Sequence, residues 1–135
     1  MIVDTSALLA FFDRDEPDHR AVAAVLENAA EPLVVSPYVV AELDYLVVTR
    51  LGVDAEIATL RELAGGAWDL DAIGTDDLTE MLPIIEKYRD QEIGVADASN
   101  VVLAHRHSTT TIATLDHRHF GVLRPVAGGH FTIVP

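Results

Sequence analysis

Short apolar, β-branched runs alternate along this chain with longer segments whose apolar residues recur at helical spacing. The strand-like runs cover residues 1–4, 33–35, 67–73, 109–115 and 131–134. Strands that alternate with helical segments are typical of a parallel sheet covered by helices. At 135 residues, half of them hydrophobic, the chain is long enough to bury one sizeable core. We therefore predict one α/β domain over residues 1–135.

The N-terminal run passes directly into Asp4-Thr5-Ser6 and then into an apolar helical segment. Asp, Thr and Ser are common helix N-caps, so a cap is the plain interpretation of this triplet. A second interpretation follows from the predicted fold, because ligands of open α/β sheets bind at the carboxyl ends of the strands. Asp4 would then belong to a binding site, and Thr5 or Ser6 would cap the helix.

Three later carboxylates have positions comparable to that of the first aspartate. Asp116 follows the fourth strand-like run. Glu42 lies on a helix expected at 37–50, about 40° around the helix from the apolar Leu46. Asp97 falls on the apolar side of the first turn of a later helix. Four negative charges near one crevice repel each other unless cations are present. Oxygen ligands without cysteine select hard cations such as Mg²⁺ or Mn²⁺, which can activate water for attack on a phosphodiester.

The overall charge argues in the opposite direction. The chain has 22 acidic residues and nine Lys or Arg, a formal net charge of −13. Proteins that bind a phosphate backbone normally carry a basic face. Clustered metal ligands, a basic partner protein or arginines concentrated on one face would reconcile this charge with a nucleic-acid substrate. The arginines considered for phosphate contacts are Arg14, Arg20, Arg106, Arg118 and Arg124.

Four motifs of the chain, in order and at their spacings, resemble those of the PIN-domain nucleases and, more narrowly, of the VapC-type toxins of bacterial toxin–antitoxin pairs. They are Ile2-Val3-Asp4-Thr5-Ser6-Ala7-Leu8, Ser36-Pro37-Tyr38-Val39-Val40-Ala41-Glu42-Leu43, Val95-Ala96-Asp97-Ala98-Ser99 and Ile112-Ala113-Thr114-Leu115-Asp116. The resemblance covers nearly the whole chain. It implies a three-layer α/β/α sandwich on a small parallel sheet, a PIN-like nuclease domain.

The resemblance also implies a function. Asp4, Glu42, Asp97 and Asp116 would be the catalytic and metal-binding acids. Thr5 or Ser6, together with Thr114, would support them through hydrogen bonds. The implied activity is Mg²⁺- or Mn²⁺-dependent endonucleolytic cleavage of structured RNA, such as tRNA or ribosomal RNA, by a metal-activated water. The implied partners are a cognate antitoxin and a second copy of the chain in a homodimer.

Two other classes of function share features of this sequence. A phosphotransfer domain of the haloacid dehalogenase type needs a second aspartate where Ser6 stands, and a response-regulator receiver needs a late lysine, whereas the only lysine is Lys87. A non-catalytic module that binds a basic partner would show the same composition. The histidine pairs His105/His107 and His117/His119 raise the possibility of a separate metal site, although i,i+2 spacing on a helix separates the side chains.

Several further expectations concern location and surfaces. The chain contains no apolar run of the roughly 20 residues that would span a bilayer and no N-terminal secretory signal, so we expect a cytoplasmic protein without membrane contact.

The helix around residues 38–48 is apolar over much of its circumference, which favours an interface. For the helix expected at 76–90, the predicted inner face comprises Leu78, Met81, Leu82, Ile85 and Tyr88.

Overall fold

A five-stranded, entirely parallel sheet forms the centre of the computed structural model, which describes residues 1–135. The strand order is β3-β2-β1-β4-β5, and Ile2 pairs with Val34 on one side and with Ile112 on the other. The strands are β1 (Ile2–Val3), β2 (Val34–Val35), β3 (Asp69–Leu70), β4 (Thr111–Ala113) and β5 (Thr132–Val134). The predicted parallel sheet is confirmed, and the last strand, β5, lies at its edge.

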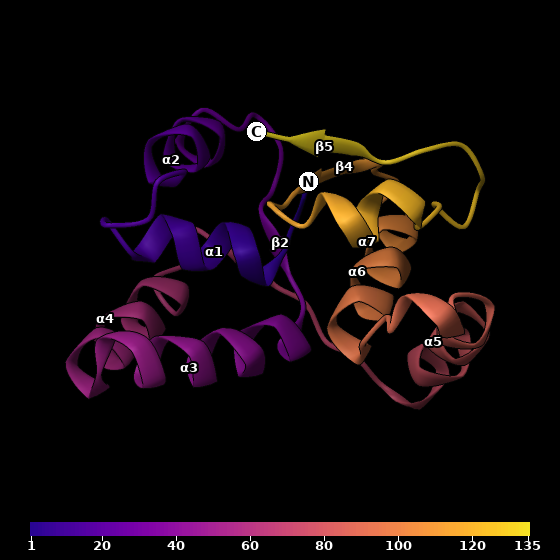
Figure 1. Cartoon of the computed structure of the whole chain (residues 1–135), viewed down its shortest axis with the longest axis horizontal. Helices are drawn as coiled ribbons and strands as arrows, with labels where there is room; N and C mark the ends of the chain where they lie inside the picture. The colour runs from indigo at the N-terminus through magenta and orange to yellow at the C-terminus, as the bar shows by residue number, and fades with distance from the viewer.

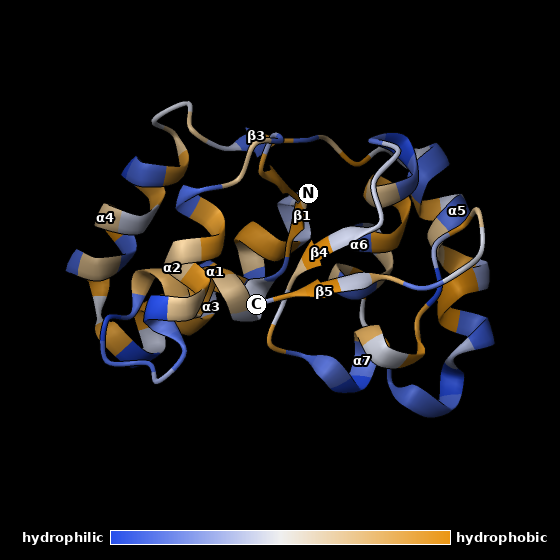
Figure 2. Ribbon diagram, turned by 90° about the horizontal axis from the view of Figure 1, so that it is seen from above, coloured by the Kyte–Doolittle hydropathy of each residue, from blue (hydrophilic) through white to orange (hydrophobic).

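Helices cover both faces of this sheet. They are α1 (Thr5–Phe12), α2 (His19–Glu27), α3 (Pro37–Leu51), α4 (Val53–Leu63), α5 (Thr75–Lys87), α6 (Val95–Arg106) and α7 (His117–Val122), with a 3₁₀ turn at Arg89–Gln91. Helices α1–α4 lie on one side of the sheet and α5–α7 on the other (Figures 1 and 2). The predicted three-layer α/β/α sandwich is therefore confirmed.

The central strands are apolar because both of their faces are covered, as parallel sheets require. Val3 packs with Leu8 and Leu43 in the core on the side of α1 and α3. Ile2 packs with Leu103 and Phe120 in the core on the side of α6 and α7. Figure 2 shows the hydrophobic colour concentrated in these strands and on the helix faces turned toward them.

The strand order creates a crevice at one point of the sheet. From β1 the chain builds outward through β2 to β3, then crosses to the other side of β1 to form β4. Open α/β sheets bind ligands at such a switch point, outside the carboxyl ends of the strands. Here the crevice lies between the ends of β1 and β4, where Asp4 and Thr114 follow their strands.

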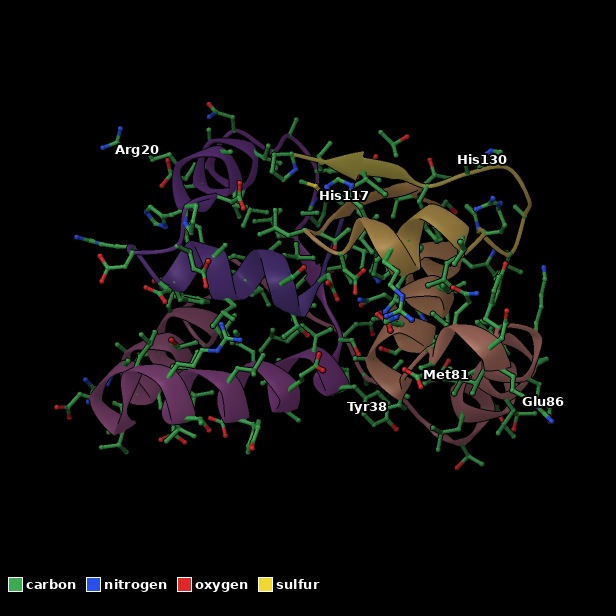
Figure 3. The ribbon with its side chains drawn as sticks, viewed as in Figure 1. Arg20, Tyr38, Met81, Glu86, His117 and His130 are labelled. Atoms are coloured by element: carbon green, nitrogen blue, oxygen red, sulfur yellow. The ribbon has the colours of Figure 1, made fainter.

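The predicted inner face of α5 is partly wrong. Met81 is buried and packs against Ala98 and Val102 of α6 (Figure 3). Leu78 and Leu82, however, are exposed, Leu82 at 59 %. The helix packs mainly on α6 through one face that carries Met81, Ile84 and Ile85, and Leu78 and Leu82 fall outside that face.

None of the helices is long and apolar enough to cross a membrane.

Candidate active site

The four predicted carboxylates come from four different parts of the chain and line one cavity of about 280 Å³. Asp4 follows β1, Glu42 lies on α3, Asp97 lies on the first turn of α6, and Asp116 precedes α7. The remaining lining residues are Thr5, Ser6, Leu9, Leu46, Arg50 and His119. The cavity lies at the switch point of the sheet described above.

Asp4 is the most enclosed of the four acids, only 5 % exposed. Its Oδ2 accepts hydrogen bonds from Ser6 Oγ and Thr114 Oγ1, each at 2.8 Å, and its Oδ1 accepts one from Asn100 Nδ2 at 3.1 Å. Burial raises the pKa of Asp4, and the hydroxyl bonds of Thr114 and Ser6 oppose that rise. The three bonds therefore hold this carboxylate in a single orientation.

Asp4 is also the N-cap of α1, because its carboxylate accepts a hydrogen bond from the amide of Ser6. The expectation that Thr5 or Ser6 would cap this helix is therefore wrong. The two interpretations of the triplet do not compete. A carboxylate has enough lone pairs to accept the capping bond and still face the cavity.

Two of the three predicted supporting residues, Ser6 and Thr114, form a hydroxyl network around the first acid. Ser6 Oγ lies 3.0 Å from Thr114 Oγ1 and accepts a hydrogen bond from the amide of Leu115 at 2.9 Å. Thr114 Oγ1 accepts one from the amide of Asp116 at 3.0 Å. Thr5 turns the other way and donates to Glu42 Oε2 at 2.5 Å. The network thus ties the end of β1 to the end of β4 and, through Thr5, to α3.

Asp97 and Asp116 meet at one histidine. His119 Nδ1 lies 3.1 Å from Asp97 Oδ2 and 3.1 Å from Asp116 Oδ2. Asp116 is the N-cap of α7 and accepts from the amide of His119 at 2.9 Å. Burial and then the nearby charge of Asp4 raise the pKa of Asp97 to about 6, against the charge of His119, which lowers it. The negative charges of the cavity are therefore only partly compensated by groups of the chain.

The donor set matches a hard cation in its chemistry. All four acids offer oxygen atoms, which Mg²⁺ and Mn²⁺ prefer, and the raised pKa of Asp97 reflects burial and repulsion that a cation would relieve. No three histidine or acidic side chains are already grouped as metal ligands. Glu42 is held at the exposed rim by Thr5, and the ring of His119 lies between Asp97 and Asp116. Binding a cation between these two acids would require that ring to move.

Sequence reasoning missed three residues at this site. Asn100 and His119 each stand three positions after a predicted acid, Asp97 and Asp116, and residues three apart share a helix face. Arg50 lies two turns beyond Glu42 on α3 and lines the same cavity. The i,i+3 spacing could have identified the first two. The role of the arginine depends on the direction of α3 relative to the sheet, which the local sequence does not reveal.

The other histidines and arginines do not join the cavity. His107 Nε2 pairs with Asp71 Oδ2 at 2.7 Å, and His130 lies on the loop before β5, away from His117 at the start of α7 (Figure 3). The chain therefore contains no histidine metal cluster. Of the arginines considered for phosphate contacts, Arg106 pairs with Asp71 and Asp77, and Arg124 donates to backbone carbonyls. Arg20 projects outward from α2 (Figure 3).

Comparison with known proteins agrees with this architecture. The chain is 63 % identical to Ribonuclease VapC26 of Mycobacterium tuberculosis over all 135 residues, which is the full length of both. The crystal structure of VapC20 of M. tuberculosis, described as a sarcin–ricin loop cleaving toxin, superposes with a TM-score of 0.85 at 16 % identity. That match covers 99 % of this chain and 98 % of VapC20.

A second solved structure has the same fold with a looser fit. FitAcB from Neisseria gonorrhoeae superposes with a TM-score of 0.63 at 22 % identity, over 97 % of this chain and 96 % of that one. The profile of the PIN domain family matches residues 1–123, which include all four carboxylates. The chain therefore belongs to the PIN domain family.

Proposed function

We propose that this chain is a single-domain, Mg²⁺- or Mn²⁺-dependent endoribonuclease and the toxin of a toxin–antitoxin pair. The observation that carries the proposal is the convergence of four carboxylates, from β1, α3, α6 and the end of β4, on one cavity at the switch point of the sheet. The full-length similarity to Ribonuclease VapC26 supports a ribonuclease over other metal-dependent hydrolases.

Asp4, Glu42, Asp97 and Asp116 are the residues that would hold the cation or cations. A bound divalent ion would lower the pKa of a coordinated water and polarise the phosphodiester. The chain itself supplies the arrangement of the acids. Asn100, Ser6 and Thr114 fix the Asp4 carboxylate, and Thr5 fixes that of Glu42.

The basic groups of the cavity suit the negative charge of the substrate. Arg50 is half exposed at the cavity and pairs only loosely with Glu16, at 3.6 Å. Its guanidinium is therefore free to contact an RNA phosphate, a common use of arginine. His119 contacts both Asp97 and Asp116 and offsets part of their charge.

The proposed activity is tested by incubating the purified chain with total tRNA and ribosomal RNA. We expect discrete cleavage products with Mg²⁺ or Mn²⁺ and none in EDTA, with activity restored when the metal is returned in excess. Discrete products are expected because the proposed substrates are structured RNAs. Cleavage that persists unchanged in EDTA would contradict the metal dependence, and RNA that stays intact with either metal would contradict the nuclease.

Two alternative functions make different predictions. A non-catalytic acidic module would bind its partner and leave RNA intact under every metal condition. A receiver-type phosphotransfer domain would need a lysine beside the acids. The only lysine, Lys87, lies over the ring of Tyr88 on α5, at 5.1 Å, and does not line the acidic cavity. The lysine position therefore argues against the receiver.

The antitoxin proposed as partner should be basic where it contacts this chain. Two adjoining cavities of about 330 and 540 Å³ between α1, α2 and α4 share Phe11, Glu27 and Glu62. We call this double cavity the acidic groove. Neither of its two shared glutamates takes part in an ion pair within the chain. An apolar floor with unpaired carboxylates at the wall suits a segment that carries arginine or lysine among apolar residues.

Charge reversal in the acidic groove tests this docking site. Glu27→Arg and Glu62→Arg are each expected to weaken binding of the proposed cognate antitoxin about 10-fold, because each juxtaposes like charges. Calorimetric titration measures the affinity. Glu80→Arg is the matched control, since it makes the same change of net charge on α5, on the opposite side of the sheet. Equal weakening by all three variants would show a general effect of net charge and contradict the groove.

The remaining proposals concern assembly and location. Large apolar side chains stay exposed on α3 and α4, namely Tyr45, Val48, Leu51, Val53, Ile57 and Leu60. Exposed apolar patches of this kind mark protein interfaces, which supports the proposed homodimer. With RNA as the substrate, we place the protein in the cytoplasm.

A further inference from the structure

Asn100 is completely buried on α6, and only one of its two polar side-chain atoms has a hydrogen-bond partner. Nδ2 donates to Asp4 Oδ1 at 3.1 Å, whereas the amide oxygen Oδ1 is buried without any hydrogen-bond partner. An ionised carboxylate only accepts hydrogen bonds, so the atom that faces Asp4 must be the amide nitrogen. The orientation of the side chain follows from this contact.

The amide oxygen of Asn100 contributes nothing to the packing of α6, because a buried carbonyl oxygen without a partner destabilises the folded state. The neighbouring α6 residues Val101, Val102 and Leu103 are apolar and buried. The hydrogen bond to Asp4 is thus the one contact that an apolar residue could not provide.

The hydrogen bonds of Asp4 show what this contact contributes. The side-chain bonds from Ser6 and Thr114 both reach the same oxygen, Oδ2. These bonds hold Oδ2 and leave Oδ1 without a hydroxyl partner. The bond from Asn100 reaches Oδ1 and comes from a different element, so both oxygens of the carboxylate are held by side chains.

We propose that Asn100 is a positioning residue that sets the orientation of the Asp4 carboxylate for binding a divalent cation. This inference rests on the proposed metal-dependent function. Partners that orient a metal ligand typically change metal affinity 10- to 100-fold when they are removed. Asn100 therefore acts on the reaction through Asp4 and does not itself touch the substrate.

Mn²⁺ titration of the purified full-length chain, followed by calorimetry, tests the proposal. Asn100→Leu keeps the approximate shape of the side chain and is expected to raise the Mn²⁺ dissociation constant about 10- to 100-fold. Ser99→Ala is the matched control, and we expect it to leave the constant within about 2-fold. Ser99 is the adjacent residue, equally buried, and its hydroxyl contacts Ser36 Oγ and the Ala96 carbonyl but no site carboxylate. Asn100→Ala is a second variant in case the leucine variant does not fold.

The possible outcomes distinguish the positioning role of Asn100 from the proposed metal site. If the wild-type chain binds Mn²⁺ and both Asn100 variants bind it equally well, Asn100 has no positioning role. Equal losses of affinity in the Asn100 variants and in Ser99→Ala would indicate a general disturbance of α6 and would also overturn the proposal. A wild-type chain that binds no Mn²⁺ would contradict the metal site itself, and with it the proposed function.

Discussion

Replacing Asp4 with asparagine is expected to reduce RNA cleavage by about three orders of magnitude, because the loss of a metal ligand removes several kcal/mol of transition-state stabilisation. The substitution keeps the shape of the side chain and an oxygen that can accept the bonds from Ser6 and Thr114. The fold should therefore persist. Initial rates of cleavage at saturating Mg²⁺, together with far-ultraviolet circular dichroism, measure the two effects separately.

Asp71→Asn provides the control for this experiment. Asp71 follows β3 at the same edge of the sheet, as Asp4 follows β1, but it lies outside the acidic cavity and pairs with Arg106 and His107. We expect this variant to cleave RNA at a rate within a few-fold of wild type at temperatures where it is folded. A folded Asp4→Asn variant with wild-type activity would remove Asp4 from the catalytic set.

The positions of the four acids could be predicted because each follows from a local rule. Asp4 and Asp116 end apolar runs, and parallel strands bring their carboxyl ends to one edge. The orientation of Glu42 and Asp97 follows from the angle of 100° per residue on a helix. These rules place side chains relative to their own element. These rules therefore predict where an acidic side chain lies whenever its helix or strand packs on the sheet as the sequence pattern indicates.

The errors and omissions arise where packing between elements decides. Leu82 belongs to the predicted inner face of α5, but the helix packs through Met81, Ile84 and Ile85, and Leu82 stays exposed. Asn100 looked like an ordinary polar residue among apolar neighbours, and its role depends on the end of β1 lying beside α6. His119 depends likewise on α6 and α7 meeting at the cavity. The i,i+3 spacing can point to Asn100 and His119, but their contacts join residues that are distant along the chain, and no local pattern encodes which side chain of another element each one meets.

Asp97→Asn is expected to stabilise the chain in EDTA at pH 8 while it impairs metal-dependent cleavage. Burial, together with the charges of Asp4 and Asp116, raises the pKa of Asp97 from 3.8 to about 6. A carboxyl group whose pKa is higher in the folded state favours folding below pH 4, and this contribution is lost as the pH rises toward and past 6. The resulting cost at pH 8 is up to about 3 kcal/mol. The neutral amide of asparagine avoids this cost and keeps an oxygen to accept from the Gly94 amide.

Thermal unfolding in EDTA at two pH values measures this effect. We expect Asp97→Asn to raise Tm by about 5–10 °C at pH 8, and by about a third as much at pH 4.5, where wild-type Asp97 is mostly protonated. Asp69→Asn is the control, because Asp69 is exposed on β3 and no hydrogen bond to its carboxylate is present. Its Tm should stay close to wild type at both pH values. An Asp97→Asn shift that is the same at pH 4.5 and pH 8 would show that the ionisation of buried Asp97 is not its cause. A shift that grows with pH would mean that the acids of this cavity weaken the fold unless a cation neutralises them.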